Sequence, residues 1–417
     1  MKVLMLCSSK SGGAATAAIR LGNALQLHSN KVTIDMLTRK DEDGKWIHSL
    51  QGFQKQKSEA SFWAEALAFE PFRNKKNKRF SFSTAQFGVD ISTHPLVQAA
   101  DIIHIHWINQ GFLSLGAIEK LAKLGKPILF SLHDMWSFTG GCHYTSTCTN
   151  YLQSCGNCFW LKSPKPNDIS NKIWKKKQHI YTQYNNLHFI PLSQWMERCA
   201  KQSSLLQNQP LHQIGNPIDS SIFQPLEKPT LRQKLGIGAD KKLLLFVAMN
   251  ANDTRKGFAL LVDSIRQLEH KKDTYEILVI GKNSTEMSQS LALSIHPLGM
   301  IRDTQKMVEI YNAADVFIIP SLEDNLPNTV VESLACGTPC VGFDTGGIPE
   351  MIDHQKNGYV AKFKDTTDLA KGIDWVLQHS DYTTLEANAR QKVMTTYDAP
   401  VIAKKYVNLY KKCLNIN

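Results

Sequence analysis

EDNLPNTVVESLACGTPCVGFDTGGIPE, residues 323–350, is the stretch that decides the fold of this chain. It follows DVFIIPS (315–321), an apolar run typical of a buried strand. Pro327 then favours a helix start, and Gly337 predicts its end. TPCVGFD (338–344) reads as the next strand. A strand, a helix and a second strand in this order predict part of a parallel sheet.

Two carboxylates, Asp324 and Glu332, stand around the start of this helix with seven residues between them. The free N–H groups near residues 325–328 point out of the helix start, where they can bind anions or hydroxyls. A carboxylate only accepts hydrogen bonds, which suits the vicinal hydroxyls of a ribose or a hexose. The segment is therefore expected to hold two polyols joined by phosphate, as in a nucleotide-sugar. The alternative is a helix cap with two solvated acids.

Strands alternate with helices on both sides of LHQIGNPIDSSIFQP (211–225), which we interpret as a linker. Strand-like runs include DIIHIHW (101–107), KPILFSLHD (126–134) and KKLLLFVAM (241–249). The pattern predicts an α/β protein with two Rossmann-like, doubly wound domains that face a cleft. We expect domains at 1–213, with an insertion at about 41–90 and a cysteine-rich loop at 139–160, and at 214–397.

The formal charge of +11 predicts an anionic partner. Much of the charge lies in RNKKNKR (73–79) and KIWKKK (172–177), with aromatic residues nearby. This composition fits an anionic membrane surface, although a solvated basic loop is the alternative. No apolar run is long enough to span a membrane and no signal peptide is evident, so a cytoplasmic protein is expected, peripheral at the inner face of the membrane.

Four cysteines crowd into one short stretch: Cys142, Cys148, Cys155 and Cys158. Four thiolates at such spacing are able to bind structural zinc. Free thiols and disulfides stay open as alternatives, although the odd total of nine cysteines argues against a disulfide framework.

Several of these stretches resemble the motifs of family 4 retaining glycosyltransferases of GT-B fold. They are LEDNLPNTVVE with the following GGIPE, SKSGGAA, IGNPIDSSIFQP and RKGFALLVDSI. LHDMWSFTGGCHY is similar to the bacterial exopolysaccharide and colanic-acid-type subset. Two features depart from the family pattern. Asp324 replaces the usual first glutamate, with Glu323 one position out of register, and Arg255 and Lys256 are adjacent instead of separated.

The resemblance implies a role for each matching residue. Glu332 would bind the ribose, while Asp324, or Glu323, and the backbone of Asn325 and Leu326 would hold the transferred sugar. Arg255 and Lys256 would neutralise the leaving diphosphate. Other implied contacts are a backbone approach at Gly12 and Gly13, a sugar or acceptor contact at His133, an acceptor hydroxyl at Asp134, and acceptor-side positions at His106 and Trp136. His104 reads as the more structural of two strand histidines.

The expected function is that of a retaining hexosyltransferase for bacterial surface polysaccharides. It would move a sugar from a nucleotide-sugar to a glycan acceptor, here expected to be lipid-linked. No cofactor is expected for catalysis, because no Asp-x-Asp run beside a strand suggests a metal site. The alternatives are a basic nucleic-acid-binding protein, for which no recognition motif is found, and a nucleotide-sugar epimerase or phosphorylase. The C-terminal stretch 398–417 would cross back to the first domain as a helix, as is usual in this fold.

Overall fold

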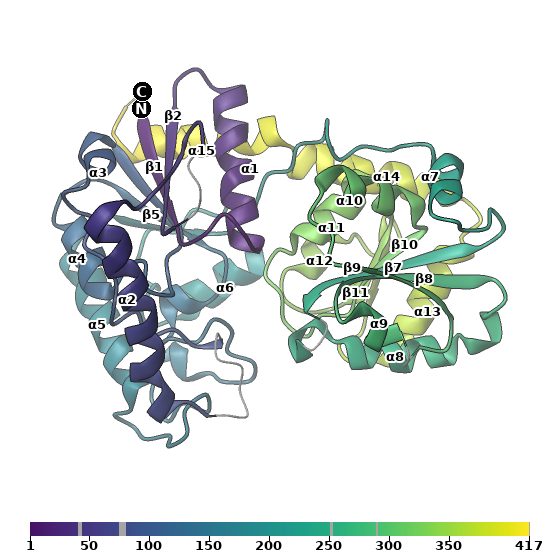
Figure 1. Cartoon of the computed structure of the whole chain (residues 1–417), viewed down its shortest axis with the longest axis horizontal. Coiled ribbons are helices and arrows are strands. Elements are labelled where there is room, and N and C mark those ends of the chain that lie inside the picture. Colours follow the sequence, from purple (N-terminus) through teal and green to yellow (C-terminus); the bar gives the residue numbers. More distant parts are fainter. Residues whose placement is uncertain (41–43, 75–80, 251–252, 289–290, 417) are drawn as a thin grey trace. The chain divides into compact units, whose positions relative to one another are not determined.

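The structure, a computed structural model of the 417-residue chain, describes residues 1–40, 44–74, 81–250, 253–288 and 291–416. The chain forms two compact units, labelled by element in Figure 1. The first comprises Met1–Pro217 with Ile402–Asn417, and the second comprises Ile218–Val401. Each unit has one six-stranded parallel sheet with helices around it. The expected pair of Rossmann-like domains is confirmed.

The sheet of the first unit has the order β3-β2-β1-β4-β5-β6, with every pair parallel. Its strands are β1 (Lys2–Cys7), β2 (Thr33–Thr38), β3 (Ile47–Ser49), β4 (Ile102–Trp107), β5 (Ile128–Leu132) and β6 (Leu187–Pro191). The order reverses between β1 and β4, and ligands of such sheets bind at the carboxyl ends beside this reversal. The loops after β1, β4 and β5 are thus placed where a site is expected.

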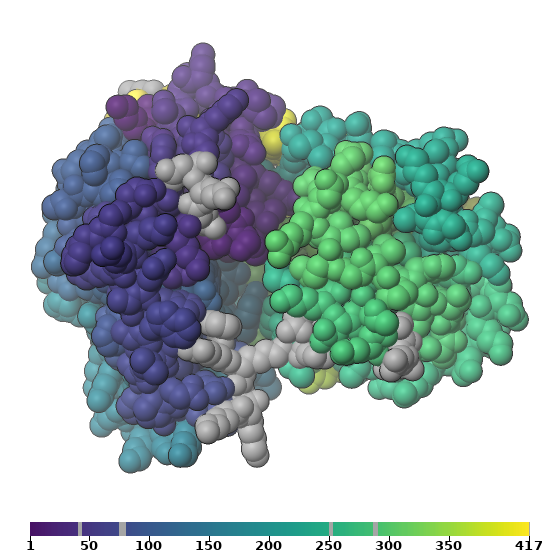
Figure 2. Space-filling model, viewed as in Figure 1, coloured from purple at the N-terminus to yellow at the C-terminus, as the bar shows by residue number. Residues whose placement is uncertain are grey.

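The helices of the first unit are α1 (Gly13–His28), α2 (Gly52–Phe69), α3 (Pro95–Ala99), α4 (Leu115–Ala122), α5 (Ile169–Gln183) and α6 (Gln194–Gln202), with short 3-10 turns η1 (Glu70–Phe72), η3 (Trp136–Phe138) and η4 (Asn150–Leu152). Asp168 begins α5 by accepting hydrogen bonds from the N–H groups of Ser170 and Asn171. Figure 2 shows α2 uncovered on the face of the first unit. Most of the basic stretch 73–79 lies outside the described residues.

The sheet of the second unit has the order β12-β11-β10-β7-β8-β9. Its strands are β7 (Lys242–Asn250), β8 (Tyr275–Lys282), β9 (Ser294–Gly299), β10 (Val316–Ile319), β11 (Cys340–Phe343) and β12 (Gly358–Ala361). Counted from β7, this is the same strand order as in the first unit. Its reversal point lies between β7 and β10, and the segment quoted at the outset begins in the loop after β10 and continues past β11.

The helical elements of the second unit are α7 (Lys228–Lys234), η5 (Thr254–Lys256), α8 (Phe258–Gln267), η6 (Glu269–Lys271), α9 (Ser284–Ser288), α10 (Thr304–Ala313), α11 (Asn328–Ala335), α12 (Ile348–Met351), α13 (Thr366–Leu377) and α14 (Tyr382–Thr396). None of the helices within the described ranges is long and apolar enough to cross a membrane.

The last helix, α15 (Ala399–Cys413), groups with the first unit from Ile402 onward. Its Tyr410 hydroxyl hydrogen-bonds His104 Nδ1 at 2.9 Å, and His104 Nε2 bonds the Ser131 hydroxyl at 2.9 Å. Burial lowers the pKa of His104 to about 3, with His133 adding to the effect. The ring is therefore neutral and serves to join α15 to strands β4 and β5.

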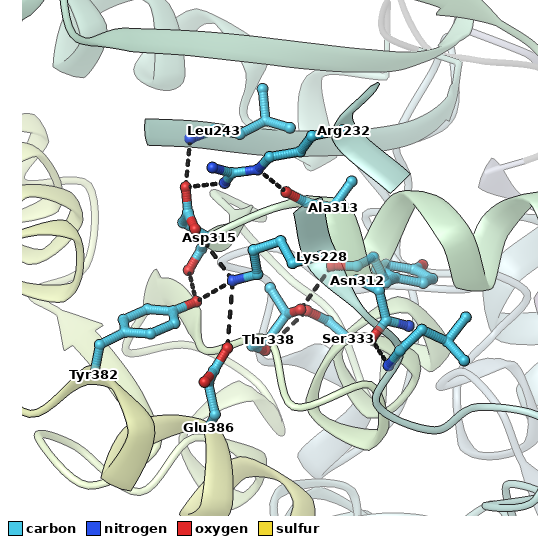
Figure 3. A network of polar contacts seen from close by, with 12 residues as sticks. Lys228, Arg232, Leu243, Asn312, Ala313, Asp315, Ser333, Thr338, Tyr382 and Glu386 are labelled. Atoms are coloured by element: carbon cyan, nitrogen blue, oxygen red, sulfur yellow. Dashed lines mark hydrogen bonds and ion pairs between the residues drawn. The ribbon is translucent and has the colours of Figure 1, made fainter. Parts of the chain in front are cut away.

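A buried polar network ties α7 to the start of β10 and to α14 (Figure 3). The Asp315 carboxylate accepts from Arg232 and Lys228 of α7, the latter at 3.1 Å, and from the N–H of Leu243 at 2.7 Å. Lys228 also lies 3.3 Å from Glu386. Arg232 and Asp315 are both about nine-tenths buried, with 8% of each side chain exposed.

Replacing Asp315 by alanine is expected to destabilise the second unit by about 3–5 kcal/mol, because Arg232 would become a buried, unpaired charge. Glu309→Ala is the matched control. It removes the partner of Lys234 at 3.7 Å, a pair in which the lysine is 59% exposed, and should cost less than about 1 kcal/mol. Chemical unfolding measures both variants. Equal losses would show that the Asp315 network does not stabilise the unit.

Candidate functional site

Three neighbouring strands of the second sheet end at the candidate site. β7, β10 and β11 are paired side by side, and their carboxyl ends share one edge because the strands are parallel. The loop after β7 carries Arg255 and Lys256, the loop after β10 carries residues 323–326, and the loop after β11 carries Gly346 and Gly347. The motif segments separated in sequence are thus brought together by strand pairing.

The turn after β7 packs backbone against backbone on the end of β10. Gly257 has a φ of +68°, and a Cβ at this position would lie 1.7 Å from the carbonyl oxygen of Pro320. The N–H of Leu322 donates to the carbonyl of Arg255 at 2.7 Å. A side chain at Gly257 would force these loops apart, so the glycine fixes where the two cationic residues lie.

Asp324 lies at the centre of a cluster of charges. Lys256 Nζ is 2.5 Å and Arg255 Nη1 is 3.4 Å from Asp324 Oδ2. Arg255 Nη1 also donates to the carbonyl of Glu323 at 2.6 Å. Burial acts to raise the pKa of Asp324, but the charges of Lys256 and Arg255 outweigh it, and the pKa lies below its usual value. Asp324 is therefore an anion that holds both cations in place.

The glycine pair after β11 completes this edge. Gly346 has a φ of +59°, and a Cβ there would lie 1.9 Å from the carbonyl oxygen of Asp324. Gly347 donates its N–H to the same oxygen at 3.0 Å, and the Thr345 hydroxyl donates to the carbonyl of Leu322 at 3.0 Å. The backbone of the β10 loop is thus held on both sides, by the turn after β7 and by the turn after β11.

Glu332 lies on α11, the helix that follows this loop, and is 8% exposed. The hydroxyl of Tyr311, on α10, donates to Glu332 Oε2 at 2.8 Å. Asn325 and Leu326 are also buried between Asp324 and the helix start, at 2% and 7% exposure. A buried carboxylate fixed by a tyrosine is suited to accept hydrogen bonds from a ligand hydroxyl, because its orientation is set in advance.

In the first unit, Asp134 lies two residues after the end of β5 and is held from three directions. It accepts from Trp107 Nε1 at 3.2 Å and from the N–H of Trp136 at 2.8 Å, and it bonds His143 Nδ1 at 2.7 Å. Burial acts to raise the pKa of Asp134, but His143 and the bond from the Trp136 N–H outweigh it, so the pKa lies below its usual value and the group stays ionised. The orientation of Asp134 is therefore fixed by the surrounding protein.

His133 and His106 form a buried pair. His106 Nδ1 lies 3.0 Å from His133 Nε2. Burial lowers the pKa of His133 to about 4, against the opposing effect of Asp134, and burial lowers that of His106 well below its usual value. Both rings are thus neutral near pH 7, able to exchange hydrogen bonds but carrying no charge. Among the described residues, His106 Nε2 has no hydrogen-bond partner.

Gly12 and Gly13 stand at the start of α1, after β1. A Cβ added at either would meet nothing within 4 Å, and Gly12 has a φ of +98°. The open space leaves their backbone accessible to a ligand.

Trp136, by contrast, is buried. It is 4% exposed, its indole N–H donates to the Ser83 carbonyl at 2.9 Å, and Lys177 Nζ lies 3.7 Å from its ring centre. Its acceptor role remains a prediction, restricted to that small exposed fraction.

The four clustered cysteines line one cavity of about 20 Å³, and Cys142, Cys155 and Cys158 belong to the hydrophobic core of the first unit. Burial raises the pKa of Cys155 to about 11 and of Cys158 to about 12, so these sulfurs are protonated thiols. Within the part of the chain that the structure describes, no three His, Cys, Asp or Glu side chains are placed to hold a metal ion. Structural zinc at the four cysteines stays a prediction.

Sequence reasoning missed the residues that orient the site. Tyr311 holds Glu332, Trp107 and His143 hold Asp134, and Asp253 caps the turn that carries Arg255, accepting its N–H at 3.2 Å. An Asp two residues before a basic turn is a local signal that could have been recognised. The other contacts join residues that are not neighbours in the sequence, and no local sequence pattern predicts them.

Comparison with known proteins gives the family of the second unit. Residues 227–392 match the family described as glycosyl transferases group 1. WcaC of Escherichia coli, assigned to colanic acid biosynthesis, is 23% identical over 76% of this chain and 76% of its own length. A Campylobacter jejuni N,N'-diacetylbacillosaminyl-diphospho-undecaprenol alpha-1,3-N-acetylgalactosaminyltransferase is 30% identical over 46% of this chain. An uncharacterised glycosyltransferase of Methanocaldococcus jannaschii is 30% identical over 44%. The chain spans about half the length of these last two relatives, 50% and 48%.

Solved structures agree on the fold. Sucrose-phosphate synthase of Thermosynechococcus elongatus superposes with a TM-score of 0.69 at 17% identity and 99% coverage of both chains. HepE of Anabaena, solved with UDP-glucose, superposes with a TM-score of 0.65 at 17% identity, over 99% of this chain and 100% of its own. The resemblance drawn from the sequence motifs is confirmed. Residues 227–392 therefore match the group 1 glycosyl transferase family, and the chain that carries them has a GT-B fold.

Proposed function

We propose that this chain moves a sugar from a nucleotide-sugar donor to a glycan acceptor in bacterial surface polysaccharide biosynthesis. The observation that carries the proposal is the cluster of Asp324, Lys256 and Arg255, which lies at the carboxyl edge of the second sheet within the segment that matches the family. Fixed cations at this edge suit a leaving diphosphate, whose charge grows as its bond to the sugar breaks.

In this proposal Glu332 accepts the ribose hydroxyls, and its bond from Tyr311 keeps the carboxylate turned toward them. Asp324 and the backbone of Asn325 and Leu326 hold the transferred sugar. Lys256 and Arg255, held beside Asp324, contact the diphosphate. In the first unit, His133 contacts the donor sugar and the anionic Asp134 accepts a hydrogen bond from the acceptor hydroxyl.

The names of two similar proteins support these substrate classes. The Campylobacter relative is named for a diphospho-undecaprenol substrate, and HepE was solved with UDP-glucose. A lipid-linked glycan and a nucleotide-hexose are accordingly the acceptor and donor classes that we propose here. Neither the nucleic-acid-binding nor the epimerase alternative has support among the relatives found.

We further propose that the anomeric configuration is retained. The acceptor oxygen would attack the anomeric carbon on the face that the phosphate leaves. The bond between that carbon and the phosphate oxygen breaks, and the leaving phosphate takes the acceptor proton. No protein nucleophile is needed, since Lys256 and Arg255 stabilise the departing diphosphate.

We also propose that α2 contacts an anionic membrane surface. Phe53, Trp63 and Leu67 are 76%, 61% and 72% exposed. At 100° per residue they fall within an arc of roughly 80°, on the opposite side from the buried Ser58, Ser61 and Phe69. The apolar arc therefore points away from the protein, and the basic stretch 73–79 follows α2 in the sequence.

The donor site is tested with Glu332→Gln, which should weaken nucleotide binding roughly tenfold, because a charged acceptor of ribose hydroxyls is lost. Thermal shifts are measured with UDP, GDP, ADP and CMP, and one nucleotide should stabilise the wild type. Glu309→Gln, a partly exposed glutamate on the neighbouring α10, is the matched control and should leave the shift unchanged. Absence of any nucleotide shift in the wild type would remove the donor proposal.

Retention is read directly from the product. Incubation of a glycan acceptor with hexose donors that carry the nucleotide identified by the thermal shifts should give a glycoside with the donor's anomeric configuration, measured by the anomeric proton coupling in NMR. A product of opposite configuration would exclude the front-face substitution proposed here.

The membrane proposal is tested by sedimentation with vesicles. Trp63→Ser/Leu67→Ser should bind several-fold less to vesicles rich in phosphatidylglycerol, because two apolar groups are removed from the contact. Leu27→Ser, on α1 and 71% exposed, is the matched control and should bind like the wild type. Equal binding of the wild type to neutral and anionic vesicles would contradict the electrostatic part of the proposal.

A further inference from the structure

A hollow of about 490 Å³ lies in the first unit between the end of α2 and the start of α5. Its lining combines apolar side chains, Phe72, Leu161 and Ile169, with three lysines, Lys162, Lys165 and Lys172. Ligand sites in proteins commonly have volumes of about 300–1,000 Å³. The cavities beside the cysteines and beside His133, in contrast, measure about 20 and 10 Å³.

The wall formed by residues 72–74 and 160–162 is fixed by backbone pairing. Arg73 and Leu161 form an antiparallel bridge, Lys162 donates its N–H to Phe72 at 2.8 Å, and Asn74 donates to Trp160 at 3.2 Å. The segments that carry Phe72 and Lys162 therefore hold their places without a ligand. The hollow is a formed feature of the fold and not a gap between loose loops.

Asp168 fixes the opposite wall and is itself satisfied. Its carboxylate accepts N–H bonds from Cys158 at 2.9 Å, Ser170 at 2.9 Å and Asn171 at 3.3 Å. The turn that carries Lys165 is closed by the N–H of Asp168, which donates to the Lys165 carbonyl at 3.1 Å. The single acid in the lining is thus occupied with backbone donors.

The lysines of the hollow are available to a ligand. Lys162, Lys165 and Lys172 are all exposed. Over the described ranges, no carboxylate forms an ion pair with any of the three ammonium groups. Three such cations around an apolar floor suit a ligand with a multiply charged anionic group attached to a hydrocarbon chain.

We propose that this hollow binds the diphosphate group of a lipid-linked acceptor, with the first part of its hydrocarbon chain against Phe72. The inference rests on the proposed function and names where its acceptor is anchored. Phe72 ends η1, the turn that directly follows α2, and is 49% exposed. A lipid-linked diphosphate lies at the membrane surface, so a site at the end of the helix proposed to contact that surface is where it would be captured.

The test uses geranyl diphosphate, a short water-soluble isoprenyl diphosphate, titrated calorimetrically into the full-length chain. Lys162→Ala/Lys165→Ala should raise the Kd about tenfold, because two charge-assisted contacts are lost. Lys175→Ala/Lys176→Ala is the matched control. It removes the same charge from two exposed lysines of α5 that do not line the hollow, and it should leave the Kd within about twofold. Equal effects in the two double variants, or no binding to the wild type, would overturn the proposal.

Two further arms identify the source of the diphosphate. Inorganic pyrophosphate should bind more weakly than geranyl diphosphate, and equal affinity would overturn the contact with a hydrocarbon chain. Phosphatidylglycerol vesicles should not displace geranyl diphosphate, and displacement would assign the hollow to ordinary lipid headgroups instead. The nucleotide thermal shift should stay unchanged in both double variants. If the wild type shows no nucleotide thermal shift, the transferase proposal fails. The titration with geranyl diphosphate still tests binding in the hollow independently.

Discussion

The candidate donor site depends on the ion cluster in which Asp324 holds Lys256 and Arg255 at one edge of the second sheet. Two close backbone approaches make this cluster geometrically necessary. Gly257 brings the cationic turn against Pro320, and Gly346 brings the turn after β11 against Asp324 itself. A Cβ at either glycine would clash with a backbone carbonyl oxygen, so the loops would have to shift apart. The cations are therefore placed in advance, and a diphosphate that arrives there meets charges already oriented, which is how fixed electrostatics lower a barrier.

The first unit orients its polar groups in a different way. Asp134 is held by Trp107, His143 and the backbone of Trp136, whereas His133 and His106 are neutral rings held against each other. Asp134 carries a negative charge, and the two histidines beside it are uncharged. In the proposed function they offer hydrogen-bond acceptors and donors to sugar hydroxyls without a large local charge. The second unit supplies the positive charge. This division matches the chemistry proposed, in which the phosphate leaves toward cations and the acceptor is positioned by hydrogen bonds.

Two features on the surface of the first unit suit contact with a lipid. The exposed apolar arc of α2 runs into η1, and Phe72 at its end also lines the lysine-rich hollow. The net charge of +11 is consistent with both features, because anionic headgroups and a diphosphate respond to the same positive field. In the proposals above, the adjoining bilayer contact and diphosphate site would hold a lipid-linked acceptor by its diphosphate and its hydrocarbon chain.

The sequence by itself determined the two parallel-sheet units, the helix after β10 and the residue types at the donor edge. These follow from local patterns: apolar runs, glycines at turns and acids beside a helix start. Only the tertiary structure decided that Asp324 pairs with Lys256, which is 68 positions away, that Tyr311 orients Glu332, and that three of the clustered cysteines, Cys142, Cys155 and Cys158, pack in a core. It also decided that Lys162, Lys165 and Phe72 share one hollow. The physical reason is that hydrogen bonds and ion pairs between distant segments depend on strand order and loop packing, which short-range sequence patterns do not encode.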